Sequence, residues 1–313
     1  MKVRIGTRGS ELARSQTDLV TSALCEAIPA LECEIVLIRT RGDIDRDTQV
    51  STGQAIGFFT KEIEEALLRD RIDIAIHSLK DLPTDIPEGL DVAAVPGRED
   101  PADALVTGEG LSLEELPTGA RVLTGSPRRR AQILHQRDDL EVTAVRGNVP
   151  TRLRKLDEGQ GDALVLACAG LRRLRLEDRI GYRFDPAVFL PAAGQGALAL
   201  QVRGDDDATR QVCEAVHDRG TGLSTAAERG FLNVLGAGCR IPAGAYGRWD
   251  PGAGVLHLSA GLALLDGSEM VRDSTSRELH DPEAAARMGR ELAGDILDRG
   301  GKDILEKALQ QLE

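Results

Sequence analysis

The chain has 313 residues, of which 41% are hydrophobic and 29% charged, a composition typical of a folded protein of two or three domains and not of a disordered chain. It carries 39 basic and 51 acidic residues, a net charge of −12, and only 3% aromatic residues. An acidic chain with few aromatic rings is a poor candidate for binding nucleic acid. No apolar run is long enough to span a membrane and no apolar leader opens the chain, so we expect no membrane partner and a cytoplasmic location.

Strand and helix patterns alternate through the first two thirds of the chain. In order, we expect a strand at 2–6, a helix at 10–28, a strand at 34–40, a helix at 59–69, strands at 72–77, 90–95 and 121–124, a helix at 128–137, a strand at 141–146, a helix at 151–158, and strands at 163–168 and 197–202. The polar, glycine-containing segment 41–57 has no period, and we interpret it as a mobile lid.

Two Pro/Gly stretches, 96–101 and 190–196, interrupt the alternation and are typical of crossings between domains. They predict two α/β lobes joined by two hinge crossings, with ligands at the carboxyl ends of the strands. After about residue 220 the pattern becomes a helix (225–235), two alternating runs (255–265 and 270–279) and two helices (282–298 and 302–312), which predicts a third, small α+β domain. The expected domains are 1–97 with 197–216, 98–196, and 217–313.

Basic residues cluster within this acidic chain. Between Arg121 and Leu156 there are eight Arg and one Lys against three acids, a local balance of +6. Guanidinium groups match carboxylates and phosphates in bidentate fashion, so the cluster indicates a small ligand with several negative charges. A solvated basic face is the alternative interpretation.

Three strand-to-helix turns contain arginine, and they favour the ligand interpretation. In GSPRR (125–129), Ser126 suits a helix N-cap and Pro127 suits the first turn, which puts Arg128 and Arg129 at the positive end of a helix. Cations are unfavourable there unless an anion binds. The segments RGNVPTR (146–152) and GTRGS (6–10) repeat the arrangement.

Lys80 and Asp81 are adjacent charges at the end of the apolar strand that precedes HSLKDLP (77–83). A carboxylate at the mouth of a cationic pocket can hold a developing positive charge and move a proton, although Asp81 could equally cap a turn. His77 is the other acid–base candidate by residue type, but a single histidine near a strand end is more often structural.

The five cysteines are odd in number and never spaced Cys-x-x-Cys, which argues against a disulfide framework and a zinc site. Four of them lie in helix or strand patterns. Cys239 lies in the glycine-flanked turn GAGCR (236–240), so it is the thiol placed for chemistry, as a nucleophile or an attachment point.

Taken together, these segments resemble the porphobilinogen deaminases, also called hydroxymethylbilane synthases. The resemblance follows the chain in order and is weakest in the last seventy residues. The matching segments are GTRGS (6–10), TRGD (40–43), HSLKDLP (77–83), GSPRR (125–129), RGNVPTR (146–152), LPAAGQG (190–196) and GC (238–239).

The resemblance implies two lobes like those of periplasmic binding proteins and a third α+β domain. It also implies a dipyrromethane cofactor joined through a thioether to Cys239. Four porphobilinogen molecules would be added head to tail to this primer with loss of ammonia, and water would then release the linear tetrapyrrole. The family implies a monomer, and a hand-over of the product to uroporphyrinogen-III synthase stays open.

Carried over by position, Asp81 would be the catalytic carboxylate and Cys239 the attachment residue. The residues that would bind the cofactor are Lys80, Thr124, Ser126, Arg128, Arg129 and Asp43. Those that would bind the substrate and growing chain are Arg8, Ser10, Arg146, Arg152 and Arg173. The sequence departs from many relatives at Ile56, where a lid lysine is common, and at Glu11, where proline is common.

Two other classes of function remain to be weighed. A solute-binding module fits two lobes and arginine turns, but it gives no role to Cys239 or to a third domain. A phosphate-metabolising enzyme lacks support, because the sequence has neither a Gly-x-x-x-x-Gly-Lys-Ser/Thr loop nor an evident carboxylate cluster for magnesium.

Overall fold

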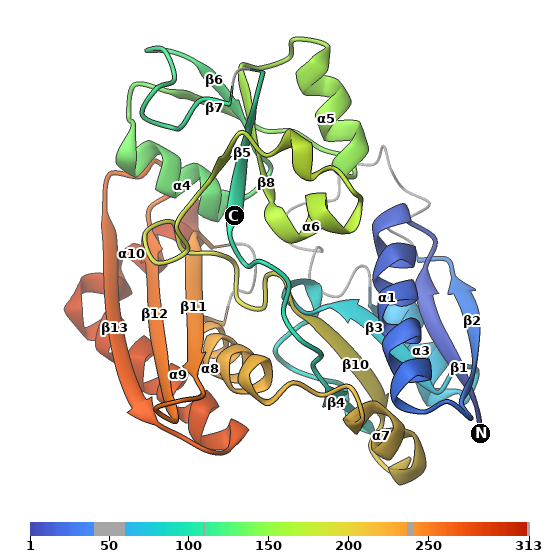
Figure 1. Cartoon of the computed structure of the whole chain (residues 1–313). Helices are drawn as coiled ribbons and strands as arrows, with labels where there is room; N and C mark the ends of the chain where they lie inside the picture. Colours follow the sequence, from blue (N-terminus) through green and yellow to red (C-terminus); the bar gives the residue numbers. More distant parts are fainter. Residues whose placement is uncertain (41–59, 109, 237–240, 312–313) are drawn as a thin grey trace.

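Three separate β-sheets organise the described part of the chain, two of five strands and one of three. The computed structural model describes residues 1–40, 60–108, 110–236 and 241–311 (Figure 1). The expected lid segment 41–57 and the turn that contains Cys239 therefore lie outside the described residues. In the part of the chain that is described, no helix is long and apolar enough to cross a membrane.

The first lobe is built on a sheet with the strand order β2-β1-β3-β10-β4, in which β1 runs parallel to β2 and β3, and β10 is antiparallel to both its neighbours. Its strands are β1 (Lys2–Arg8), β2 (Glu32–Ile38), β3 (Ile74–Ser78), β4 (Leu90–Ala94) and β10 (Leu198–Arg203). Its helices are α1 (Glu11–Ala27), α3 (Lys61–Leu68) and α7 (Asp207–Glu214). Apolar side chains of α1, Val20 and Leu24, are buried against Val3 and Ile5 of β1 in its core.

The second lobe repeats this plan, with the strand order β7-β6-β8-β5-β9. Here β6 is parallel to β7 and β8, and β5 is the antiparallel strand. Its strands are β5 (Asp103–Thr107), β6 (Arg121–Leu123), β7 (Glu141–Thr143), β8 (Ala163–Ala167) and β9 (Tyr182–Arg183). Its helices are α4 (Pro127–Gln136), α5 (Val149–Asp157) and α6 (Cys168–Arg173).

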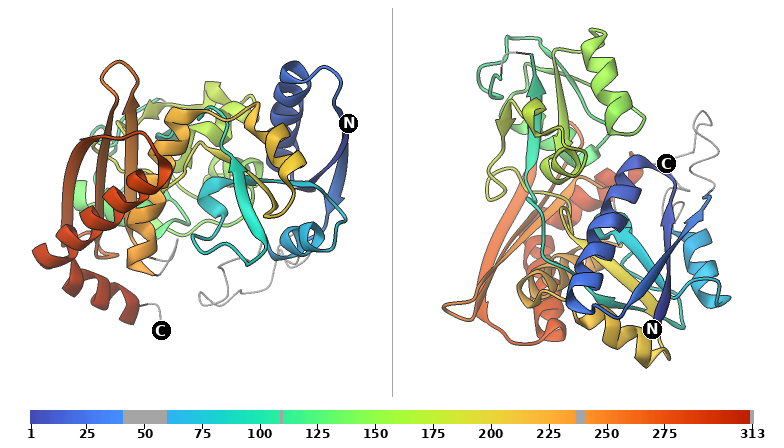
Figure 2. Two further views of the ribbon diagram at one scale, coloured as in Figure 1. Left: turned by 90° about the horizontal axis from the view of Figure 1, so that it is seen from below. Right: turned by 45° about the vertical axis from the view of Figure 1, so that its right-hand side comes forward.

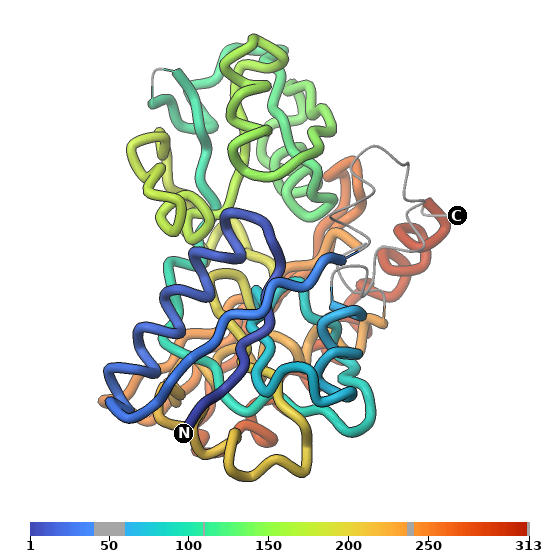
Figure 3. Tube along the Cα trace, turned by 90° about the vertical axis from the view of Figure 1, so that its right-hand side faces the viewer, coloured from blue at the N-terminus to red at the C-terminus, as the bar shows by residue number. Residues whose placement is uncertain are grey.

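The chain passes between the lobes twice, from β4 into β5 and from β9 into β10. Each passage supplies the antiparallel strand of the sheet it enters. Figure 3 shows the second lobe, in green, beside the blue and cyan first lobe, with the yellow segment returning to the first lobe. The predicted fold class, two α/β lobes joined by two crossings with a further α+β domain, is confirmed.

The third sheet is an antiparallel meander of β11 (Ala243–Asp250), β12 (Val255–Ala263) and β13 (Met270–Glu278). The helices α8 (Arg219–Leu235), α9 (Pro282–Ile296) and α10 (Lys302–Gln310) pack beside it (Figure 2). Phe231 of α8 and Met288 of α9 are fully buried in this core. The two helices approach closely because Gly289 has no side chain: a Cβ there would overlap the carbonyl oxygen of Ala227.

Most predicted elements are present, with ends shifted by a few residues. The helix predicted at 225–235 begins earlier, at Arg219, because Asp218 caps it by accepting a hydrogen bond from the Thr221 backbone N–H. Among the helices and strands of the described residues, the sequence analysis missed the helices α6 and α7 and the strands β5, β9 and β11. Those strands are short or rich in small residues, and their hydrogen-bond partners come from distant parts of the chain.

Candidate active site

The three arginine-bearing turns adopt the predicted local structure. The hydroxyl of Ser126 accepts the backbone N–H of Arg129 at 3.4 Å, with Pro127 in the first turn of α4. The hydroxyl of Ser10 likewise accepts the N–H of Ala13 at the start of α1, at 3.3 Å. In the third turn, Asn148 is the N-cap residue of α5. Each turn follows or ends a strand, so the three arginine segments stand at strand ends of the two lobes.

A buried carboxylate, Asp103 of β5, lies between the arginines of the α4 turn. Its Oδ2 is 2.7 Å from Nη1 of Arg128, and its Oδ1 is 2.7 Å from Nη2 and 3.0 Å from Nε of Arg129. Burial would raise the pKa of Asp103, but the two guanidinium groups outweigh burial and hold this pKa well below its usual range. Asp103 therefore stays ionised and fixes both arginines.

This pairing refines the expectation for Arg128 and Arg129. Both side chains are about 5% exposed, and they also donate to backbone carbonyls of Leu190 and Val165. The charge of one aspartate offsets only one of the two guanidinium charges, so the turn keeps a net positive charge. The sequence analysis missed Asp103, whose one signal was a charged residue inside the apolar run of 103–107.

Lys80 and Asp81 form a short 3₁₀ turn directly after β3. Burial lowers the pKa of the Lys80 amino group. The negative charge of Asp81 raises this pKa, and the positive charges of Arg129 and Arg128 of the other lobe lower it further. Burial also lowers the pKa of Arg152 to about 10, and its charged neighbours are Arg129 and Asp81. The structure thus brings the Lys80–Asp81 turn of one lobe to the arginines of the other.

The Asp81 carboxylate is exposed, and within the described residues no hydrogen bond reaches it. Lys80 is half-buried, and its Nζ lies 3.4 Å from Oε1 of Gln195. The amide nitrogen of Gln195 donates to Asp103 at 2.9 Å and to the carbonyl of Pro101 at 2.7 Å. Gln195, which the sequence analysis quoted in a motif without a role, links the lysine of the first lobe to the buried aspartate of the second.

The residues predicted to bind the substrate are spread over a wider area than the cluster around Lys80 and Asp103. Arg173 is half-buried, and its Nη2 donates to the carbonyl of Gly196 at 2.6 Å; burial lowers its pKa. Arg152 donates through Nε to the carbonyl of Gly147 at 2.7 Å. Arg146 is exposed in the turn before α5, and Arg8 is half-buried at the end of β1.

Two further residues were expected to bind the cofactor. Thr124 is buried, and its hydroxyl accepts a hydrogen bond from the Ser126 backbone N–H, whereas Asp43 lies outside the described residues.

His77 is buried and takes part in a polar chain within the first lobe. Its Nε2 lies 3.0 Å from Oε1 of Gln201, whose Nε2 donates to Glu64 at 3.2 Å. Burial lowers the pKa of His77 to about 4, the hydrogen bond that its Nε2 makes to the Gln201 oxygen opposes this, and the charge of Arg8 adds to the lowering. The imidazole is therefore neutral at neutral pH, and the structural interpretation of His77 is favoured over an acid–base role.

His77 should make the protein less stable in mild acid. Because its pKa is lower in the folded chain than in the unfolded one, its stabilisation is complete above pH 6.5 and is lost as the pH falls toward 4. Between pH 7 and pH 4.5 we expect wild type to lose about 2–3 kcal/mol more free energy of unfolding than His77→Gln, measured by urea denaturation. Parallel pH dependences of the two proteins would show that His77 is not the titrating group.

Helix α8, which precedes Cys239 in the chain, contacts the segment that directly follows Asp81. Arg229 of α8 donates to the carbonyls of Leu82 at 2.9 Å and Pro83 at 2.7 Å. The helix ends at Gly236, in the left-handed region with φ +67°. Cys239 itself lies outside the described residues, but α8, the helix that precedes it in the chain, is anchored to the segment that follows Asp81.

These features define a two-lobed α/β protein with a third domain, in which cationic side chains of the second lobe lie near Lys80 and the exposed Asp81 of the first. Family models match residues 3–211 ("Porphobilinogen deaminase, dipyromethane cofactor binding domain") and 223–298 ("Porphobilinogen deaminase, C-terminal domain"). The chain belongs to the porphobilinogen deaminase family, and it has the domain in which that family binds its dipyrromethane cofactor.

Curated relatives match almost end to end. The porphobilinogen deaminase of Syntrophobacter fumaroxidans is 43% identical over 97% of both chains. Those of Deinococcus radiodurans and Thermus thermophilus are each 46% identical over 97% of this chain and 98% of their own. Among solved structures, the methionine-binding protein MetQ gives a TM-score of 0.44 at 14% identity, covering 69% of this chain and 89% of MetQ. The fold class rests on the sheet orders of this chain and not on that likeness.

Proposed function

We propose that this chain joins four porphobilinogen molecules head to tail, with loss of one ammonia per addition, and releases the linear tetrapyrrole hydroxymethylbilane by hydrolysis. Family membership supports the reaction. The observation that carries its location is the link from Lys80 through Gln195 to Asp103, the aspartate that fixes Arg128 and Arg129 of the other lobe. Each pyrrole of the substrate bears an acetate and a propionate, which is the ligand chemistry that such a cluster suits.

The residues of this cluster fit a covalent dipyrromethane group. Two joined pyrroles carry four carboxylates, and the net positive α4 turn with Lys80 supplies matching cations. When bound, the group supplies a free pyrrole carbon as the nucleophile for the first addition. We propose that Lys80, Thr124, Ser126, Arg128, Arg129 and Asp43 hold it, and that Arg8, Ser10, Arg146, Arg152 and Arg173 hold the incoming substrate and the growing chain.

Asp81 is proposed as the catalytic carboxylate. In each addition the bond between the aminomethyl carbon and nitrogen of the substrate breaks, its electron pair leaves with ammonia, and positive charge develops on the pyrrole. An ionised carboxylate stabilises that charge, and it can then accept the proton that the nucleophilic ring carbon loses on coupling. The lack of a hydrogen bond to Asp81 within the described chain supports this role, because no described residue occupies the carboxylate oxygens.

Attachment through Cys239 has a direct test. We expect the intact mass of the purified chain to exceed its sequence mass by one dipyrrole unit, and Cys239→Ser to lose both the excess mass and the activity. Cys25→Ser, which removes a half-buried thiol of α1, is the control and should keep both. A chain of unmodified mass that still converts porphobilinogen would contradict the proposal.

The remaining assignments follow from the family. We propose that the protein is a cytoplasmic monomer and that it hands its product over to uroporphyrinogen-III synthase. The proposed domains are 1–97 with 197–216, 98–196, and 217–313. These bounds are supported by the strands of the three sheets, each of which falls within one proposed domain.

A further inference from the structure

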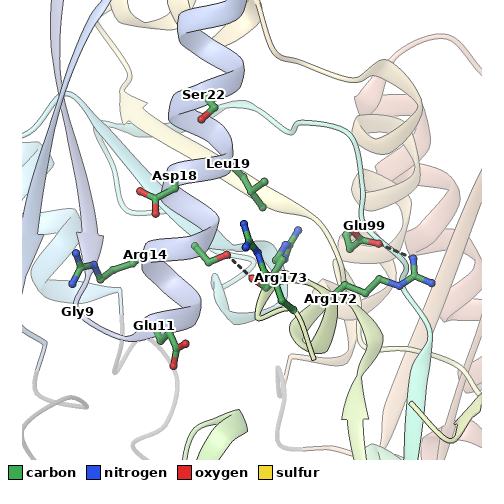
Figure 4. Close-up of a pocket in the computed structure, with 11 residues that line it drawn as sticks. Gly9, Glu11, Arg14, Asp18, Leu19, Ser22, Glu99, Arg172 and Arg173 are labelled. Carbon is green, nitrogen blue, oxygen red and sulfur yellow. Dashed lines mark hydrogen bonds and ion pairs between the residues drawn. The ribbon is translucent and has the colours of Figure 1, made fainter. Parts of the chain in front are cut away.

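A groove separates helix α1 of the first lobe from helix α6 of the second (Figure 4). Its cavity volume is about 680 Å³, within the range of small-molecule sites. The hydroxyl of Ser15 donates to the carbonyl of Arg173 at 2.7 Å, so the two walls are joined by a hydrogen bond between the lobes. Gly9, which lies between Arg8 and Ser10, also lines the groove, as does Arg173. The groove therefore adjoins the residues proposed above to hold the incoming substrate.

The groove contains an exposed arginine in the turn that ends helix α6. Arg175 lines it with φ +57°, one of two non-glycine residues with positive φ among the described residues. A left-handed backbone is unfavourable for a branched-Cβ or long side chain and is normally left to glycine or asparagine. The Arg175 side chain is exposed, and within the described part of the chain it has no hydrogen bond or ion pair. This backbone conformation closes helix α6, because the Arg175 N–H donates to the carbonyl of Arg172 and the Leu176 N–H to that of Leu171, each at 2.9 Å. The exposed guanidinium is therefore the feature of Arg175 that the groove offers to a ligand.

The other groups in the groove supply apolar surface and charges of both signs, among them the exposed Arg14 and Asp18 of α1. Leu19 is 53% exposed and projects from α1 toward Arg173 (Figure 4). Arg172 is already paired with Glu99 at 3.0 Å and with Asp100 at 3.2 Å. Glu11, by contrast, is an exposed carboxylate with no hydrogen bond from the described residues. An uncommitted cation, an uncommitted anion and an apolar platform lie within one cavity.

We propose that this groove is a waiting site for a second porphobilinogen molecule beside the reaction site. The inference rests on the proposed function. Free porphobilinogen carries two carboxylates, an ammonium group and a flat ring, whereas the internal rings of the growing chain have lost the ammonium group. Arg175 would bind a carboxylate, Glu11 the ammonium group, and Leu19 the ring face. A molecule held there would move into the adjacent substrate site after each addition.

The test counts bound ligands on the complete protein with a probe that cannot react. The probe is the porphobilinogen analogue with an aminoethyl group in place of the aminomethyl group. Calorimetric titration should give two molecules per chain for wild type and one for Leu19→Glu. Leu68→Glu is the matched control, because Leu68 is a 50% exposed leucine on helix α3 outside the groove, and it should keep two. A single site on wild type, or two sites of unchanged affinity on Leu19→Glu, would overturn the proposal.

Two charge variants separate the site from simple damage. Arg175→Gly removes the cation and relieves the backbone, so the melting temperature should stay or rise while the KM for porphobilinogen rises about five- to tenfold at unchanged kcat. Arg175→Lys should restore KM. Glu11→Gln should weaken the aminoethyl probe but not the analogue with a plain methyl group. An unchanged KM in Arg175→Gly would contradict the waiting site.

The proposed function is tested independently of the waiting site. It would be contradicted if wild type carried no covalent dipyrrole and consumed no porphobilinogen, whatever the probe count. If wild type turns over normally and the groove variants match it in both KM and stoichiometry, the waiting site alone is wrong.

Discussion

Asp81→Asn should fold, keep its covalent dipyrrole and turn over about 10²–10⁴-fold more slowly than wild type, because an amide keeps the shape of the carboxylate but neither holds positive charge nor accepts a proton. Asp81 is exposed and makes no hydrogen bond within the described residues, so the fold does not depend on it. Product formation from porphobilinogen measures the rate, intact mass measures the attached group, and thermal unfolding measures the fold.

Glu88→Gln is the control for Asp81, since Glu88 is an exposed carboxylate on the same connection between β3 and β4. It should retain the wild-type rate. Asp81→Glu tests geometry, because it restores the charge one methylene further out and should recover part of the activity. Near-native turnover of Asp81→Asn would rule out the charge and proton role given to this residue.

Glu228→Gln should lower the free energy of unfolding by about 3–5 kcal/mol, the range for breaking a buried ion pair on one side. Glu228 lies in α8 and is fully buried, and its oxygens accept Arg98 Nη1 at 2.7 Å and Nη2 at 3.0 Å. They also accept the backbone N–H groups of Gly194 and Gly247, each at 2.7 Å. One carboxylate of the third domain therefore holds both crossings between the lobes.

Urea denaturation with Glu283→Gln as the control tests this role. Glu283 pairs with Arg290 at 2.6 Å, but both side chains are largely exposed, so removing that pair should change stability by less than about 1 kcal/mol. The double variant Arg98→Met with Glu228→Gln should be less destabilised than Glu228→Gln alone, because it leaves no unpaired buried charge while the amide oxygen still accepts a backbone N–H group. Equal, small effects of Glu228→Gln and Glu283→Gln would show that the carboxylate does not secure the crossings.

Several parts of the site are readable from the sequence because their causes are local. Ser126 and Pro127 specify the start of α4 through neighbours three residues away. The buried strand β3 and the charges that follow it are contiguous, so the place of Lys80 and Asp81 at a strand end needs no distant contact. The alternation of strands and helices, broken twice by Pro/Gly stretches, likewise sufficed for the two-lobed fold class.

Only the tertiary structure decided which partners the buried charges have. Arg128 meets Asp103 across 25 residues and Arg98 meets Glu228 across 130, and nothing in their local sequence indicates either pairing. The strands β5 and β11 were missed for the same reason, since a strand forms where a distant partner offers its hydrogen bonds. Charge near a helix start is a property of the local sequence; whether that charge faces a ligand or a buried aspartate depends on which distant strand the fold brings to it.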